Sequence, residues 1–381
     1  MQIIGLNVDQ FLSEHWQKRP LLIRNPWDNW HNPLEPDELA GLSCEEDVES
    51  RLVTREERQL TVETGPLPEA RFGELSGPWT LLVQAVNHYV RNVAALVEPF
   101  RFLPGWRIDD VMVSYATDGG GVGPHFDQYD VFLIQGLGKR RWRVGPRCSS
   151  VTPLVPHEDL RLIAAFDATE EWILEPGDIL YVPPLFAHEG VAIGDDCMTY
   201  SVGFRAPSRA ELVDGWCEHQ VAVLEDDERY VDPDLKAQSH PSEIAASAID
   251  RLYAMTMEAL SDRDAFARWF GLHTSLPKYP EADWRPEQPI KQAAVRNLLA
   301  DGASLHRNPA SRFSFIRQAP AVLLFVDGYC FDCTDDTAAL AEKLCEGPAI
   351  RIDPALAASI PVQALITALI NQGSLTFNNR D

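Results

Sequence analysis

Two side chains able to bind a metal follow a run of glycines near the middle of the 381-residue chain. His125 and Asp127 come directly after the glycine-rich segment 119–124, and the apolar run Val131–Ile134 follows them. The apolar run predicts a strand, and side chains two positions apart on a strand point to the same face. An imidazole and a carboxylate that converge in this way supply two ligands of a metal site. The third should come from a neighbouring strand.

His188 is the best candidate for that third ligand. It ends the stretch 175–188, in which a Pro-Gly-Asp turn leads into an apolar run and two prolines. Two histidines and one carboxylate on one face leave three coordination positions open, and this is the ligand set of non-haem Fe(II) sites. Structural zinc instead prefers four closed Cys or His ligands. We therefore expect His125, Asp127 and His188 to hold Fe(II).

The open coordination positions on iron can bind a chelating 2-oxoacid. Its distal carboxylate then needs a fixed cation. On the predicted strand 140–144, Arg140 shares a face with the apolar residues, whereas Arg141 and Arg143 face the other way. An inward Arg without an anion would cost about 3–5 kcal/mol, and a guanidinium binds a carboxylate through two parallel hydrogen bonds. We assign Arg140 to the distal carboxylate of 2-oxoglutarate, with Ser114 as a hydroxyl partner. The alternative is an ion pair between Arg140 and an internal acid.

Short strands separated by Gly/Pro turns must position these residues, from about residue 107 to 205. The predicted strands are Val111–Thr117, Tyr129–Gly136, Arg140–Val144, Glu171–Leu174, Ile179–Val182 and Met198–Phe204, with a hairpin turn at 137–139. This pattern favours a mainly β fold, a sandwich or small barrel with flanking helices. The stretch 175–188 is typical of barrels of the cupin type, so we expect a double-stranded β-helix. Residues 35–100 look mainly helical, with an apolar stripe over 79–90 that should pack on the sheet.

The remaining chain predicts two further modules. Apolar residues recur at helical spacing on one face after Pro241, so we expect a helical segment over 208–279. Such helices pack on the same chain or on a twin subunit, and a two-fold dimer is the commonest assembly of this kind. After a linker over 279–287, residues 287–381 predict a winged-helix-like α+β domain. Its parts are a helix near 289–300, a hairpin turning at Asp327-Gly328, a helix over 337–345 and a last helix over 361–371. This domain carries eight Lys/Arg against ten Asp/Glu, so we expect a structural or protein-docking role and no nucleic-acid binding.

The net charge of −24, from 33 basic and 57 acidic residues, disfavours binding to phosphate backbones. It would attract a strongly basic protein, although an acidic surface can also serve solubility alone. Seven scattered cysteines do not form a disulfide framework, and neither a secretory signal nor a long apolar run is present. We therefore expect a cytoplasmic protein without a membrane span.

Several motifs resemble those of JmjC-type 2-oxoglutarate oxygenases. They are Phe11-Leu12 with Trp16, Lys18 and Pro20, the Gly123-Pro124-His125-x-Asp127 motif, the Arg140 strand and the Pro176–His188 stretch. Four stretches resemble the bacterial ribosomal oxygenases more closely: Trp16–Pro20, Leu82–His88, Gly119–Asp130 and Tyr200–Pro207. The resemblance is strong over the first 210 residues and extends to the layout of the remainder.

This resemblance implies a protein hydroxylase that uses Fe(II), 2-oxoglutarate and O2 to hydroxylate C3 of an arginine in large-subunit ribosomal protein sixteen, a basic partner. It also implies a JmjC domain over 1–207, a dimerisation segment and a winged helix. By position it assigns iron to His125, Asp127 and His188, and 2-oxoglutarate to Arg140 and Ser114.

A cationic substrate needs acidic or aromatic groups at the mouth of the site. Asp118 and Tyr129, which flank the glycine loop and the metal-binding strand, are our candidates. Thr199 stands where the closest relatives are expected to carry Asn, which leaves the contact from that position open.

Two other interpretations use the same residues. A cupin-type metal isomerase or a dioxygenase of small molecules without a cosubstrate would not need Arg140. A ligand-sensing cupin with a DNA-binding tail would need salt-sensitive binding of residues 287–381 to duplex DNA.

Overall fold

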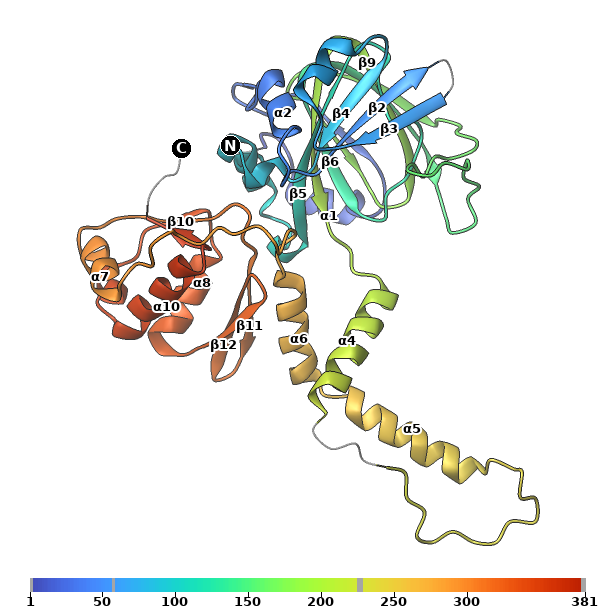
Figure 1. Cartoon of the computed structure of the whole chain (residues 1–381), viewed down its shortest axis with the longest axis vertical. Coiled ribbons are helices and arrows are strands. Elements are labelled where there is room, and N and C mark those ends of the chain that lie inside the picture. The colour runs from blue at the N-terminus through green and yellow to red at the C-terminus, as the bar shows by residue number, and fades with distance from the viewer. Residues whose placement is uncertain (1–2, 57–58, 225–228, 378–381) are drawn as a thin grey trace. The chain divides into compact units, whose positions relative to one another are not determined.

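The computed structural model describes residues 3–56, 59–224 and 229–377, which divide into two compact units (Figure 1). The first unit comprises residues 1–206, 278–311 and 346–381, and the second comprises 207–277 and 312–345. Among the described residues, none of the helices is both long and apolar enough to cross a membrane.

A nine-stranded sheet dominates the first unit, and Figure 1 shows its strands curving around a common interior. Its strands are β1 (Leu21–Ile23), β2 (Ser50–Glu56), β3 (Gln59–Thr64), β4 (Trp79–Val83), β5 (Ile108–Ala116), β6 (Asp130–Arg147), β7 (Glu170–Leu174), β8 (Ile179–Val182) and β9 (Phe186–Phe204). The order is β1-β8-β6-β9-β5-β4-β2-β3, with β7 paired to β6. The long strands β6 and β9 pair antiparallel along most of their length and hold the other strands on either side.

Both faces of β6 are buried, because each face of this part of the sheet has its own apolar cluster. Phe132 and Ile134 join the cluster beneath the N-terminal helix α1 (Val8–Glu14), where Phe11 packs edge-on against Tyr181 at a ring separation of 5.0 Å. Val131 and Leu133 point to the opposite side, into the interior of the sheet. The alternation therefore sorts side chains between a structural core and an internal cavity.

Two local predictions are wrong. The helices within residues 35–100 are short, namely α2 (Pro36–Leu42), α3 (Arg91–Ala94) and 3-10 helices of three to six residues. The strands β2, β3 and β4 lie in the same region, and β4 is formed by the apolar run at 79. Residues 137–139 do not form a hairpin turn. The two strands predicted on either side are one strand, β6, in which Gly138 (φ +59°) marks a shift of register opposite β9.

The first unit also contains helices α7 (Gln292–Ala300), α9 (Pro354–Ala357) and α10 (Ile360–Asn371), with a small sheet of β10 (Leu305–Arg307), β14 (Ala349–Ile350) and β15 (Leu375–Thr376). The second unit contains α4 (Arg209–Val223), α5 (Ala246–Leu260), α6 (Arg263–Ser275) and α8 (Asp335–Leu344), with the sheet β11 (Phe313–Gln318), β12 (Ala321–Val326) and β13 (Tyr329–Cys333). The predicted turn at Asp327-Gly328 joins β12 to β13, and both residues have positive φ.

Candidate active site

His125 and His188 face each other as an antiparallel backbone pair. The His125 N–H donates to the His188 carbonyl at 3.0 Å, and the His188 N–H donates to the His125 carbonyl at 2.8 Å. Directly opposed residues project their side chains to one face, so the two imidazole centroids lie 4.3 Å apart. The His125 segment precedes β6 and makes only this isolated bridge, yet the bridge produces the convergence that the spacing predicts.

Asp127 completes the group. Its carboxylate Oδ2 lies 3.6 Å from Nε2 of His188, and one ligand atom from each of His125, Asp127 and His188 lies within 4.8 Å of the others. The Leu185 N–H donates to the Asp127 carbonyl at 2.7 Å, which keeps the two chain segments in register.

Hydrogen bonds from both histidines fix which ring nitrogen can bind a metal. Nδ1 of His125 lies 3.0 Å from the carbonyl oxygen of Gly123, and Nδ1 of His188 lies 2.9 Å from that of Phe186. A carbonyl oxygen only accepts, so each Nδ1 carries the hydrogen and each Nε2 presents a lone pair to the centre of the group. Burial, followed by the nearby charge of His125, lowers the pKa of His188 to about 4. His188 is therefore neutral at pH 7, the form that a metal needs.

The glycine loop lets the backbone before His125 pass close to the strand that carries His188. Gly123 has φ +83°, and its carbonyl is the partner of His125. A Cβ on Gly121 would lie 2.4 Å from the carbonyl oxygen of Gly190, so only glycine fits there.

The three residues line a cavity of about 570 Å³ enclosed by the strands of the first unit, and Arg140 lines the same cavity. Arg140 is only 5% exposed, as the alternation of β6 predicts. Its Nη1 lies 3.3 Å from Oγ of Ser114, and its Nε lies 3.4 Å from Sγ of Cys197. Its Nη2 is buried without a hydrogen-bond partner, and no acid pairs with Arg140 in the described part of the chain.

Two further buried donors line this cavity without a protein partner, Oγ1 of Thr80 and Nε1 of Trp142. Buried polar groups are almost always hydrogen-bonded, so donors left open in a cavity with a buried guanidinium could bind an anionic ligand. Thr80 lies on β4, in a segment predicted to be helical, so no pattern in the sequence marked it as a cavity residue. Thr199 lines the same cavity, and its hydroxyl donates to Oε1 of Gln135 at 3.2 Å.

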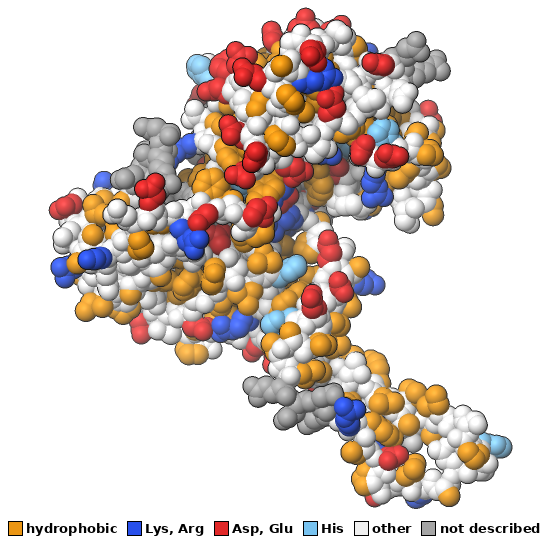
Figure 2. All heavy atoms as spheres, in the orientation of Figure 1, with side chains coloured by type: hydrophobic (Ala, Val, Ile, Leu, Met, Phe, Trp, Pro, Cys, Tyr) orange, Lys and Arg blue, Asp and Glu red, His pale blue; other side chains and the backbone are white. Residues whose placement is uncertain are grey.

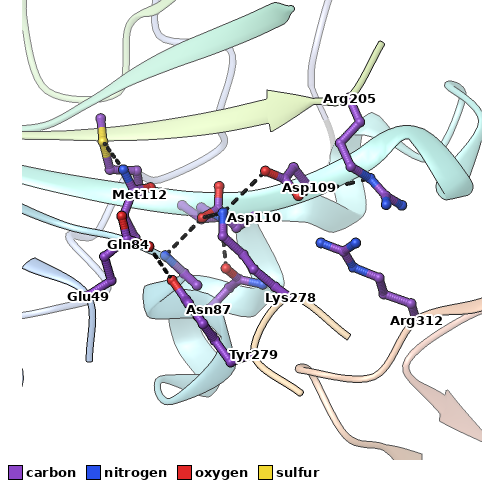
Figure 3. A network of polar contacts seen from close by, with 12 residues as sticks. Glu49, Gln84, Asn87, Asp109, Asp110, Met112, Arg205, Lys278, Tyr279 and Arg312 are labelled. Carbon is purple, nitrogen blue, oxygen red and sulfur yellow. Dashed lines mark hydrogen bonds and ion pairs between the residues drawn. The ribbon is translucent and has the colours of Figure 1, made fainter. Parts of the chain in front are cut away.

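Asp109 and Asp110 are adjacent acids that sequence reasoning missed; both line this cavity and belong to a network of polar contacts (Figure 3). Asp110 is 5% exposed, and its Oδ2 accepts from the Ala85 N–H at 3.0 Å and from Nζ of Lys278 at 2.7 Å. Nζ of Lys278 also lies 3.2 Å from Oδ2 of Asp109. Burial raises the pKa of Asp110, while the ammonium of Lys278 opposes that rise.

The two substrate-contact candidates from the sequence have different positions. Tyr129 lines the cavity, and burial together with the charge of Asp127 raises the pKa of its phenol. Asp118 is exposed and is not among the lining residues; its carboxylate instead accepts from the Gly194 N–H at 2.7 Å.

Comparisons with known proteins agree with this geometry. Residues 95–212 match the JmjC domain family, and residues 258–376 match the ROXA-like winged-helix family. The ribosomal protein uL16 3-hydroxylase of Escherichia coli is 44% identical over 305 residues, which cover 80% of this chain and 81% of that protein. A probable ribosomal oxygenase of Haemophilus influenzae is 43% identical over 54% of this chain and 51% of that protein. The structure of the E. coli ribosomal oxygenase with cobalt and 2-oxoglutarate has a TM-score of 0.86 at 36% identity and covers 99% of both chains.

Proposed function

We propose a function for this chain from the premise that it belongs to the JmjC ribosomal oxygenases, as its similarity to the E. coli uL16 3-hydroxylase over most of both chains establishes. It is a 2-oxoglutarate-dependent oxygenase that hydroxylates ribosomal protein uL16, and the target side chain is an arginine. Because the substrate is a ribosomal protein, we propose that the reaction takes place in the cytoplasm. The acidic surface of the first unit suits a basic partner (Figure 2).

One observation carries this proposal. A His-Asp-His group with converging ligand atoms and a buried guanidinium with an open donor line one cavity. We assign His125, Asp127 and His188 to Fe(II), and Arg140, with Ser114, to the distal carboxylate of 2-oxoglutarate. The bound metal and cosubstrate supply the oxidising chemistry with O2, and the protein supplies position and a water-poor pocket. An isomerase without a cosubstrate would have no carboxylate to pair with the buried cation of Arg140.

We propose that the substrate arginine binds in the part of the cavity lined by Asp110 and Tyr129. Asp110 presents a buried carboxylate to the cavity, and the ring of Tyr129 approaches the same glycine, Gly203. A Cβ on Gly203 would lie 3.9 Å from Oδ1 of Asp110 and 3.9 Å from Cε2 of Tyr129. A carboxylate can accept two hydrogen bonds from a guanidinium, and an aromatic ring can flank its alkyl stem. We therefore assign substrate contact to Asp110 and Tyr129, and none to Asp118.

The second unit supports two finer proposals. Helix α5 has no buried residue, and Ile249, Leu252, Tyr253 and Met257 on it are 39–67% exposed. Such an apolar surface on a monomer favours association. We therefore propose a homodimer that buries α5, which lies within the predicted dimerisation segment 208–279. The winged-helix region begins at residue 287 in the sequence prediction and at residue 258 in the family match. We propose that it docks protein and not DNA.

Mass spectrometry of uL16 tests the function. Incubation of uL16 with the purified chain, Fe(II), 2-oxoglutarate and O2 should add the mass of one oxygen atom to a single arginine. The Asp127→Ala variant is the control and should leave uL16 unmodified. Succinate release by the wild-type chain without any change in uL16 would mean that another protein is the substrate.

A further inference from the structure

Within the described part of the chain, Lys278 is the residue whose cation contacts the buried carboxylate of Asp110 in this cavity. It lies directly after the segment 207–277 that belongs to the second unit, yet it is part of the first unit with Asp110. Its side chain is only 20% exposed, and its Nζ lies 2.7 Å from Oδ2 of Asp110 and 3.2 Å from Oδ2 of Asp109 (Figure 3). Most lysine side chains lie in water, so a largely buried lysine that lines the candidate active site needs a physical explanation.

The contacts of Asp110 show what this ammonium does. Lys278 and the Ala85 N–H both bind Oδ2, and no hydrogen bond to Oδ1 is present among the described residues. Oδ1 lies on the side of Gly203 and Tyr129, toward the cavity. Two donors therefore fix one carboxylate oxygen and leave the other free to accept from a ligand.

We propose that Lys278 is a positioning residue for substrate recognition, which holds the Asp110 carboxylate ionised and oriented to receive the guanidinium of the substrate arginine. This inference rests on the proposed function. The ammonium leaves the proposed guanidinium partner open, because it binds Oδ2 and not Oδ1 of Asp110.

Electrostatics agree with the geometry. Burial raises the pKa of Asp110, Asp109 adds to the rise, and Lys278 is the largest opposing influence. The other groups that face Asp110 are the phenols of Tyr129 and Tyr279, which are neutral at pH 7. Arg205 pairs with Asp109 at 3.9 Å. Removal of the Lys278 charge should therefore raise the pKa of Asp110, and a protonated Asp110 cannot pair with a guanidinium.

Peptide binding without turnover tests the inference. A uL16 peptide with the target arginine, and the same peptide with neutral citrulline in its place, would be titrated into cobalt-loaded, 2-oxoglutarate-bound protein from pH 5 to 8. We expect Lys278→Met to weaken binding of the arginine peptide about tenfold, which corresponds to a loss of about 1.4 kcal/mol of binding free energy. The loss of affinity should grow as pH falls, because Asp110 is protonated at a higher pH in the variant. The acidic limb, meaning the fall in affinity at low pH, should therefore move to higher pH. Lys278→Arg should restore binding.

The control is Lys139→Met, which removes a lysine from an exposed ion pair of 2.6 Å with Glu175 outside the cavity and should change nothing. In an Asp110→Asn background, Lys278→Met should have no further effect, because its action passes through that carboxylate.

Three results would overturn the inference. Tighter binding of the arginine peptide by Lys278→Met would make Lys278 a competitor of the substrate. An equal loss for the arginine and citrulline peptides would make its role purely structural. An unchanged acidic limb would exclude the electrostatic link. A wild-type protein that does not prefer arginine over citrulline would instead contradict the proposed arginine substrate.

Discussion

Replacement of Arg140 by Met separates ligand binding from folding more sharply than other substitutions in this cavity. The guanidinium is buried, its contacts with Ser114 and Cys197 are long, and Nη2 has no partner. Loss of the cation would leave the distal carboxylate of 2-oxoglutarate buried and unpaired, at a cost of about 3–5 kcal/mol. We therefore expect the Kd for 2-oxoglutarate to rise about 10²–10³-fold or more.

Met at position 140 should not destabilise the ligand-free protein, because it replaces a buried, incompletely bonded cation by an apolar side chain of similar length. Isothermal titration calorimetry would give the Kd, and urea unfolding would give the free energy of unfolding with and without 2-oxoglutarate. At about 100 times the wild-type Kd, the ligand should stabilise the wild-type protein by about 2.7 kcal/mol and should not stabilise the variant.

Arg141→Met is the matched control, because Arg141 is the next residue on the same strand and is exposed. It should retain wild-type affinity for 2-oxoglutarate. A Kd for Arg140→Met within threefold of the wild-type value would refute the assignment of Arg140 and revive the interpretation as a metal enzyme without a cosubstrate.

Two further predictions concern the metal-free protein and the second unit. Because the pKa of His188 is lowered to about 4 from 6.5, the unfolded chain binds a proton that the folded chain does not. The unfolding free energy should therefore fall between pH 6.5 and 4, by about 3 kcal/mol, in urea titrations of metal-free protein. His188→Gln should remove this part of the dependence, and an equal fall in that variant would contradict the reasoning. On α5, Leu252→Glu with Tyr253→Glu should convert a dimer to a monomer in light scattering, because charges replace exposed apolar side chains. A monomeric wild-type protein would argue against a dimer.

The sequence predicted the parts of the site that depend on local spacing. The alternation along one strand correctly turned Arg140 inward, and the glycine loop with its following His-x-Asp motif correctly marked one half of the candidate metal site. Thr80 was missed because β4 is a short apolar run, and such a run has no periodicity that separates a strand from a helix. Gly138 looked like a turn, but in the strand it only shifts the register.

The contact of Lys278 with Asp109 and Asp110 could not be predicted, for a different reason. Asp109 and Asp110 are adjacent acids that a sequence presents as a solvated pair, and Lys278 is separated from them by more than half of the JmjC barrel and all the intervening helices. Only the folded chain brings the three side chains together, and only burial distinguishes Asp110 from an ordinary surface acid.

A crystal structure of this chain with cobalt and 2-oxoglutarate is the most direct test of the assigned site. We expect an anomalous peak within about 2.2 Å of Nε2 of His125, Nε2 of His188 and a carboxylate oxygen of Asp127. The distal carboxylate of 2-oxoglutarate should bind the guanidinium of Arg140, including its open Nη2. A metal bound elsewhere, or a distal carboxylate held away from Arg140, would contradict the account.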